Sequence, residues 1–283
     1  MEKISVCLLT YNRASVLPQT LDTILNQTYT NFELIIGDNC STDNTKEVCL
    51  SYLEKDNRIK YIRNETNLGL TGNLNVLIKN SSCELIANLF DGDLYDINLL
   101  KKWVSALTLN SNAAFVFNSY AEIDSNKNVT KIFEENLPNC ISGKLLLENL
   151  FYKRWHFDSP VFGTVLGKKS LYTKFNYFNN DFGFYADVDM WMRLCEEYDV
   201  CYIKEPLIFL PAKNILPHQF KVSFIEEQKF LEKIFYNSRK RHYKSSSILL
   251  IYNLFQHTIF VFFARTYKYI VHQRRYLLNN LCR

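Results

Sequence analysis

Glu84-Leu-Ile-Ala-Asn-Leu-Phe-Asp-Gly-Asp93 is the stretch of sequence on which the fold and the chemistry of this chain depend. Residues 84–90 have the composition of a β-strand buried inside a sheet. Asp91 and Asp93 follow directly, one residue apart, at the carboxyl end of that strand. Carboxylate oxygens are the ligands that Mg²⁺ and Mn²⁺ prefer. The stretch therefore predicts a divalent-metal site, with an ordinary Asp-Gly-Asp turn as the alternative.

Strands and helices alternate on both sides of this stretch, through residue 118. Short apolar runs predict strands at residues 4–9, 32–37, 59–62, 84–90 and 113–118. Apolar residues at helical spacing predict helices at residues 14–26, 48–53, 69–79 and 99–109. This alternation predicts an α/β fold, with a doubly wound, mostly parallel sheet and helices on both faces. Thr10, Asp38 and Asp91 would then meet at one edge of the sheet, where such folds bind ligands.

The sequence beyond residue 118 is less regular. Residues 118–143 are polar and loop-like, with a strand pair predicted around residues 129–133. Helices are predicted at 145–152 and 187–198, and strands at 160–166, 200–203 and 207–210. Neither a G-x-G-x-x-G stretch nor a G-x-x-x-x-G-K-[ST] stretch occurs, which argues against a dinucleotide cofactor and a P-loop.

The net charge of +4 hides an asymmetry along the chain. Residues 233–283 contain ten Lys and Arg and no Asp or Glu, which leaves 23 basic and 29 acidic residues before them. A basic tail on an acidic body indicates contact with an anionic surface. The eight Cys lack metal-ligand or C-x-x-C spacing, and no signal peptide is visible, so we expect a reduced, cytoplasmic protein without a zinc site.

The tail contains an apolar segment at residues 248–264. Its 17 residues include Asn, Gln, His and Thr, and basic residues flank it on both sides. A membrane span needs about 20 apolar residues. The segment is therefore interpreted as a helix lying in a membrane interface, with a helix packed on the body and a true span as the alternatives.

Several motifs, taken in order, resemble those of glycosyltransferase family 2. They are Ile4-Ser-Val-Cys-Leu-Leu-Thr-Tyr-Asn-Arg13, Leu25-Asn-Gln-Thr-Tyr29, Glu33-Leu-Ile-Ile-Gly-Asp-Asn-Cys-Ser-Thr-Asp43, Asn67-Leu-Gly-Leu-Thr-Gly-Asn-Leu-Asn75, the D-x-D at 91–93 and Ala186-Asp-Val-Asp-Met-Trp-Met-Arg-Leu194. The resemblance covers about residues 3–210 and implies a GT-A fold. Residues 1–212 would form the catalytic domain, divided into a nucleotide-binding half (1–118) and an acceptor half (119–212). Residues 213–283 would form a basic, aromatic, helical extension.

The resemblance also implies roles on the donor side of a sugar-transfer site. Thr10 and Asn12 would line the nucleotide, and Asp38 would bind its base. Asp91 would lie near the ribose and the sugar, and Asp93 would bind Mn²⁺ or Mg²⁺. The motif departs from the family at residues 39–40, where Asn-Cys replaces the common Asp-Gly.

On the acceptor side, the resemblance implies that Asp187 is the general base. Ala186 stands where Glu is usual, which leaves Asp189 as an alternative base or as a structural acceptor. His218 lies at about the distance where relatives place a His near the diphosphate, and a loop histidine without that role is the alternative.

The implied activity is metal-dependent, inverting transfer of a hexosyl or deoxyhexosyl unit from a nucleotide diphosphate sugar to a hydroxyl of a lipid-linked glycan. Such reactions build cell-surface polysaccharides of the O-antigen or capsule type, at the inner face of the cytoplasmic membrane, without nucleic acid as a partner. Two alternatives are a non-catalytic subunit that binds the nucleotide sugar, and a nucleotidyltransferase. The latter would need a glycine-rich basic loop after the first strand, which residues 10–13 do not provide.

Overall fold

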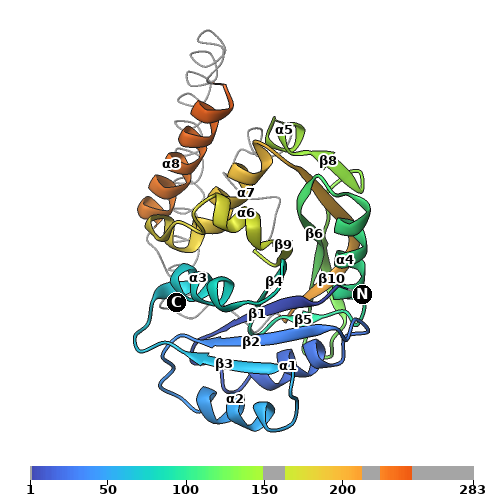
Figure 1. Ribbon diagram of the computed structural model, residues 1–283, viewed down its shortest axis with the longest axis vertical. Coiled ribbons are helices and arrows are strands. Elements are labelled where there is room, and N and C mark those ends of the chain that lie inside the picture. The colour runs from blue at the N-terminus through green and yellow to red at the C-terminus, as the bar shows by residue number, and fades with distance from the viewer. Residues whose placement is uncertain (1, 149–162, 212–223, 244–283) are drawn as a thin grey trace, which may run out of the picture.

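The computed structural model describes residues 2–148, 163–211 and 224–243 (Figure 1). Its first half is a regular α/β unit. Four parallel strands stand in the order β3-β2-β1-β4. They are β1 (Ile4–Thr10), β2 (Phe32–Asp38), β3 (Ile59–Arg63) and β4 (Leu85–Phe90), and the connecting helices are α1 (Leu17–Leu25), α2 (Thr45–Leu53) and α3 (Gly69–Asn80). The elements expected from the sequence in this half are confirmed.

The second half continues the same sheet in the order β4-β9-β6-β10-β5, with β7 on β6 and β8 on β10. Its described strands are β5 (Leu94–Tyr95), β6 (Ala113–Ile123), β7 (Val129–Phe133), β8 (Cys140–Ser142), β9 (Val165–Lys168) and β10 (Asp199–Pro211). Its described helices are α4 (Leu99–Leu109), α5 (Gly143–Leu146), α6 (Lys169–Lys174), the 3₁₀ helix η2 (Asn180–Tyr185), α7 (Ala186–Cys195) and α8 (Phe224–His242). Only β6 and β10 run parallel here, so the sheet is parallel in its first half and mixed in its second.

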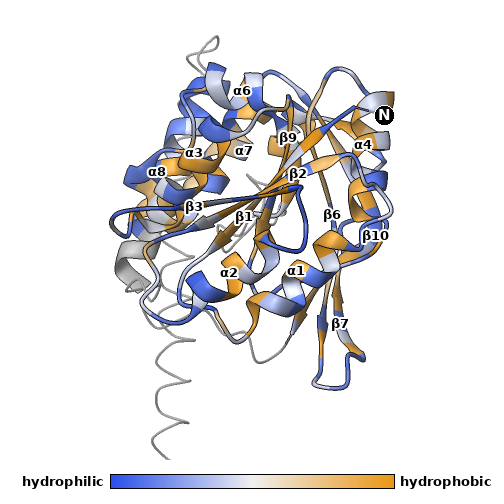
Figure 2. Cartoon of the chain, turned by 60° about the horizontal axis from the view of Figure 1, so that its bottom comes forward, coloured by the Kyte–Doolittle hydropathy of each residue, from blue (hydrophilic) through white to orange (hydrophobic). Residues whose placement is uncertain are grey.

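Alternation along the buried strands builds one core on each face of the sheet. In β1, Val6 and Leu8 join the core beneath α1, α2 and α4, whereas Cys7 and Leu9 join the core beneath α3, α7 and α8. Figure 2 shows these strands as a hydrophobic layer between helices whose outer faces are hydrophilic. The expectation of helices on both faces is therefore confirmed.

Some boundaries differ from the sequence-based expectation. The two strands expected at 200–203 and 207–210 are one strand, β10, which is bulged around Pro206. The strand expected at 160–166 begins outside the described residues. Its described part is β9, which pairs antiparallel with both β4 and β6. The helix expected at 145–152 is described as α5, and residues 149–152 lie outside the described part.

Two expectations concern residues outside the described ranges, His218 and the apolar segment at 248–264. Within the described residues, no helix is long and apolar enough to cross a membrane. α8 is amphipathic, and its Ile234 and Phe235 are fully buried against the body.

Candidate active site

Parallel register brings the ends of β1, β2 and β4 together. Thr10 is paired with Asp38, and Leu9 with Phe90, the residue before Asp91. The Asp91 N–H donates to the Leu9 carbonyl at 3.2 Å. The structure thus places Thr10, Asp38 and Asp91 at one sheet edge, as the strand pattern predicts.

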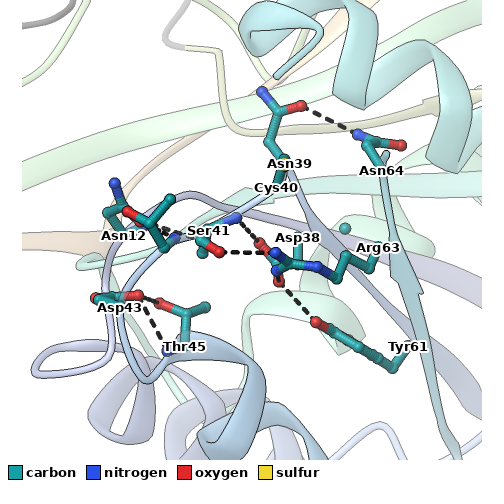
Figure 3. Close-up of polar contacts among 12 residues, drawn as sticks. Asn12, Asp38, Asn39, Cys40, Ser41, Asp43, Thr45, Tyr61, Arg63 and Asn64 are labelled. Carbon is teal, nitrogen blue, oxygen red and sulfur yellow. Dashed lines mark hydrogen bonds and ion pairs between the residues drawn. The ribbon is translucent and has the colours of Figure 1, made fainter. Parts of the chain in front are cut away.

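Asp38 lies at the centre of a polar cluster at this edge (Figure 3). The side chain is fully buried, and it accepts from the Ser41 N–H at 2.8 Å, the Tyr61 hydroxyl at 2.6 Å and the Arg63 guanidinium at 2.5 Å. Burial opposes the charge on Asp38, but these hydrogen bonds outweigh it and hold the pKa of that carboxyl below its usual value. Both carboxylate oxygens are therefore engaged by the protein itself.

Asn12 joins the loop after β1 to the loop after β2 (Figure 3). Its backbone N–H donates to the Ser41 hydroxyl at 2.9 Å, and its Oδ1 accepts from the Thr42 N–H at 2.7 Å. Asn12 has a φ of 53°, which asparagine tolerates better than most residues. Cys40 has a φ of 67°, a backbone conformation that glycine adopts more easily than other residues.

Asn39 was not predicted as a site residue, yet it joins two loops of the same edge. Its amide donates to the Asn67 side chain at 2.8 Å and to the Gly69 carbonyl at 3.1 Å. Its Oδ1 accepts from Asn64 at 3.1 Å and from the Leu68 N–H at 2.9 Å. Asparagine can do this because its amide both donates and accepts, whereas an ionised aspartate only accepts.

Arg13 and Thr20 hold the Asp91-Gly92-Asp93 turn. Arg13 Nε lies 3.3 Å from Asp91 Oδ1, and the Tyr11 N–H donates to Asp91 Oδ2 at 3.2 Å. The Thr20 hydroxyl accepts from the Gly92 N–H and donates to the Asp93 carbonyl, each at 2.9 Å. A positive φ of 87° at Gly92 allows the turn.

The carboxyl groups of this turn are costly to ionise without a partner cation. Burial raises the pKa of Asp91 to about 6, against the lowering effects of Thr10, Arg13 and the Tyr11 N–H. Burial raises the pKa of Asp93 well above its usual value, and the negative charge of Asp91 adds a smaller increase. Asp93 Oδ2 is buried and has no hydrogen-bond partner in the described structure. Such an oxygen fits a cation ligand.

The described residues contain no group of three or more His, Cys, Asp or Glu side chains that could hold a metal ion. At this turn, Asp91 and Asp93 are therefore the two carboxylates that could bind a metal ion. Mg²⁺-type cations commonly take one or two carboxylates and complete their shell with water and substrate phosphates. The residues present fit a cation of that kind.

Asp187 lies in the first turn of α7. A Cβ atom placed on Gly163 would lie 3.2 Å from both Asp187 Oδ2 and the Phe90 ring, so this carboxylate lies close to the end of β4. Asp187 is half-buried, and this burial raises the pKa of its carboxyl group to about 7. The Val188 N–H donates to Oδ1 at 2.8 Å and lowers the pKa in part.

Asp189 is placed differently. It is buried and forms an ion pair with Arg193 Nε at 2.8 Å. Arg193 also donates to the carbonyls of Phe175 and Tyr177, so the pair fixes the segment that precedes η2. Of the two acids at the start of α7, Asp187 lies by the sheet edge and Asp189 is held by an internal partner.

A family model described as glycosyl transferase family 2 matches residues 5–174. The Escherichia coli UDP-Glc:alpha-D-GlcNAc-diphosphoundecaprenol beta-1,3-glucosyltransferase WfgD is 32% identical over 146 residues, which are 52% of this chain and 55% of that protein. The Campylobacter jejuni GalNAc(5)-diNAcBac-PP-undecaprenol beta-1,3-glucosyltransferase is 31% identical over 202 residues, or 70% of this chain and 61% of that protein. The chain thus spans less than two thirds of the length of either relative.

Solved structures share the fold. Staphylococcus aureus TarS in complex with UDP-GlcNAc superposes with a TM-score of 0.68 at 19% identity, covering 84% of this chain and 66% of that one. The mannosyltransferase PcManGT from Pyrobaculum calidifontis, in complex with GDP-Man and Mn²⁺, gives 0.60 at 16% identity, covering 93% and 73%. The expected GT-A fold is confirmed. With a family model matching more than half of its residues, the chain belongs to glycosyl transferase family 2.

Proposed function

We propose that this protein is an inverting, metal-dependent glycosyltransferase. It moves a hexosyl or deoxyhexosyl unit from a nucleotide diphosphate sugar to a hydroxyl of a lipid-linked glycan, in cell-surface polysaccharide synthesis of the O-antigen or capsule type. The observation that carries the proposal is the position of the Asp187 carboxylate, which has a raised pKa, beside Phe90 at the end of β4 and next to the acidic turn at 91–93. Family membership supports it, as do the undecaprenol-linked substrates in the names of two relatives.

The donor would bind across the loops that follow β1, β2 and β4. Thr10 and Asn12 would line the nucleotide, and Asp91 would lie near the ribose and sugar. Asp38 would support the base through Tyr61 and Arg63, since both of its oxygens are already held by the protein. Structural neighbours that hold UDP-GlcNAc or GDP-Man support a nucleotide-sugar donor.

Asp93 would hold a Mn²⁺ or Mg²⁺ ion through its Oδ2, which has no hydrogen-bond partner in the part of the chain that the structure describes. A bound divalent cation supplies electrostatic stabilisation of the negative charge that grows on the leaving diphosphate. Arg13 lies 3.3 Å from Asp91 and contributes a fixed positive charge at the same place. PcManGT, which was solved with Mn²⁺, supports a metal-bound donor.

Asp187 would act as the general base. The acceptor oxygen forms a bond to the anomeric carbon from the face opposite the nucleotide diphosphate, whose bond to that carbon breaks with both electrons. The hydroxyl proton moves to the Asp187 carboxylate, and the anomeric configuration inverts. A pKa of about 7 suits this task, because a base works best when its pKa lies near the working pH.

A second candidate is a subunit that binds the nucleotide sugar without transferring it. The observation behind it is Ala186, which is buried at the first position of α7 and stands where the resemblance to the family implies an acid. The raised pKa of Asp187 and its position beside Phe90 favour transfer instead.

A donor screen tests the proposed function. UDP-, GDP- and dTDP-sugars would be added with Mn²⁺, and the melting temperature and slow donor hydrolysis measured. We expect one nucleotide class to stabilise the protein and to be hydrolysed, because a ligand that binds only the folded state raises its stability. Stabilisation without hydrolysis would favour the non-catalytic subunit, and no stabilisation by any donor would exclude both.

We also propose that residues 1–212 form the catalytic domain, divided near residue 118, and that the extension beyond it reaches an anionic membrane at the cytoplasmic face. α8 packs on the body through Leu231, Ile234 and Phe235, so the membrane contact would involve residues 244–283.

A chain ending at Tyr243 tests this role of the tail. It keeps the buried face of α8 and should stay folded. We expect the full chain to sediment with phosphatidylglycerol vesicles and the shortened chain to remain in the supernatant, because basic residues near a membrane are attracted to anionic lipid. Equal sedimentation of both chains would contradict the proposal. Vesicles of phosphatidylcholine are the control.

A further inference from the structure

A cavity lies away from the acidic turn. It has a volume of about 550 Å³ and is bounded by residues 175–182, α7 and α8. That volume falls within the range of about 300 to 1,000 Å³ that is typical of ligand pockets. Asp91, Asp93 and Asp187 are not among its lining residues, so it is distinct from the candidate active site.

One wall of the cavity is a segment held in an unusual conformation. Asn176 and Tyr177 both have positive φ, at 57° and 60°. Arg193 donates to the carbonyls on either side of Asn176, and Asn75 both donates to and accepts from the backbone of Phe178, at 2.8 and 3.1 Å. Strained backbone persists only where its surroundings over-determine it. The wall is therefore preformed.

The lining carries an excess of positive charge. Arg193, Lys233 and Arg241 line the cavity, against the single carboxylate of Asp189. Arg193 is paired with Asp189, and Arg241 with Glu196, which lies behind the lining. Lys233 is exposed, lies 5.4 Å from the Phe182 ring centroid, and has no carboxylate partner in the described residues. An ammonium so placed favours an anionic ligand.

The remaining lining consists of aromatic rings and side-chain amides. Four asparagines contribute, of which Asn237 comes from α8 and the others from the wall segment. An amide offers both donors and acceptors, which matches sugar hydroxyls. The rings of Phe178 and Phe182 are almost fully buried, whereas Phe175 and Tyr177 are partly exposed and offer apolar faces against which the C–H faces of a sugar can pack. The lining thus combines groups suited to a sugar ring with a cation suited to its anionic substituent.

We propose that this cavity binds a phosphorylated saccharide, namely the phosphate-bearing sugar of the acceptor glycan. The proposal rests on the proposed function. Asp189, which lines the cavity, and Asp187 stand two residues apart in the first turn of α7. At about 100° per residue their side chains are about 200° apart, so the cavity and the base lie on nearly opposite sides of the first turn of α7. An acceptor glycan of several sugars that passes around this turn would place its phosphate-bearing sugar in the cavity and a more distant sugar at Asp187.

N-acetylglucosamine 1-phosphate is a suitable probe, because the acceptor named for the E. coli relative carries GlcNAc on a diphosphate. Its binding to the full chain, without metal or donor, would be measured by calorimetry. We expect Lys233→Ala to weaken binding about tenfold or more, since hydrogen bonds to charged groups are the stronger ones. Lys240→Ala, an exposed lysine of the same helix that does not line the cavity, should bind like the wild type, and so should Asp93→Asn.

Equal affinity of wild type and Lys233→Ala, or an equal loss in Lys240→Ala, would overturn the proposal. So would N-acetylglucosamine or inorganic phosphate binding as tightly as the ester. Phosphatidylcholine vesicles carrying a polyprenyl diphosphate N-acetylglucosamine identify the source. Capture that depends on Lys233 assigns the site to the lipid-linked form, and binding of the soluble ester alone assigns it to free sugar phosphates. Donor hydrolysis by the wild type, measured without acceptor, tests the proposed function separately.

Discussion

Asp93→Asn is expected to remove the response to Mn²⁺ and to lower sugar transfer at least about a hundredfold, because a bound metal supplies several kcal/mol of charge stabilisation. The substituted asparagine would keep the size of the side chain but lose the charge that holds a cation. The wild type should melt at a higher temperature with Mn²⁺ and donor than without them, and the variant should not.

The same variant should be at least as stable as the wild type when no metal is present. Asp93 is buried, and its Oδ2 has no hydrogen-bond partner among the described residues, so its carboxyl group destabilises the metal-free fold. Asp96→Asn is the matched control, since Asp96 follows closely in sequence and accepts from the Asn98 N–H at 2.8 Å instead of facing the site. A metal response retained by Asp93→Asn, or lost by Asp96→Asn, would contradict the role of Asp93.

The first half of the fold could be predicted from the sequence because its signals are local. Each strand there is a short apolar run followed by a helix with apolar residues at helical spacing. The second half depends on pairing between distant segments. In the structure β9 pairs antiparallel with β4 and β6. The run of apolar residues in its sequence predicts a strand but does not predict with which strands it pairs. Pro206 suggests a break between two strands, yet the bulges on either side let β10 continue past it.

The site shows the same division. Asp38, Asp91 and Asp93 could be predicted as site residues because they lie in motifs at the ends of strands. Their partners could not, because each comes from another element. Tyr61 and Arg63 reach Asp38 from the end of β3, and Thr20 reaches the acidic turn from α1. The ion pair between Asp189 and Arg193 has the i, i+4 spacing of a helix, so a search for such pairs in the sequence would have revealed it.

Asp187→Asn is expected to lower sugar transfer by about 10²- to 10⁴-fold, the usual contribution of a general base. Donor binding and its dependence on Mn²⁺ should remain, because Asp187 lies on the acceptor side. Asp189→Asn is the matched control, with the same chemical change two residues along α7. It should lose stability instead, since breaking a buried ion pair costs about 3 to 5 kcal/mol. Greater loss of transfer in a folded Asp189→Asn than in Asp187→Asn would reverse the assignment.

The pH dependence provides a second test of Asp187 that needs no substrate. Its carboxyl group has a pKa of about 7 in the folded protein and about 4 when unfolded. Between these values the folded state binds a proton that the unfolded state has lost, so this group makes stability fall as pH rises. Asp187→Asn should therefore be more stable than the wild type at pH 8, with the difference shrinking towards pH 4 in denaturant titrations. In the wild type, kcat/KM for the acceptor should rise about tenfold per pH unit below pH 7 and level off above it, because only the ionised carboxylate takes the proton. A difference in stability that does not change with pH would show that Asp187 titrates normally, which would remove the physical reason for assigning it as the base.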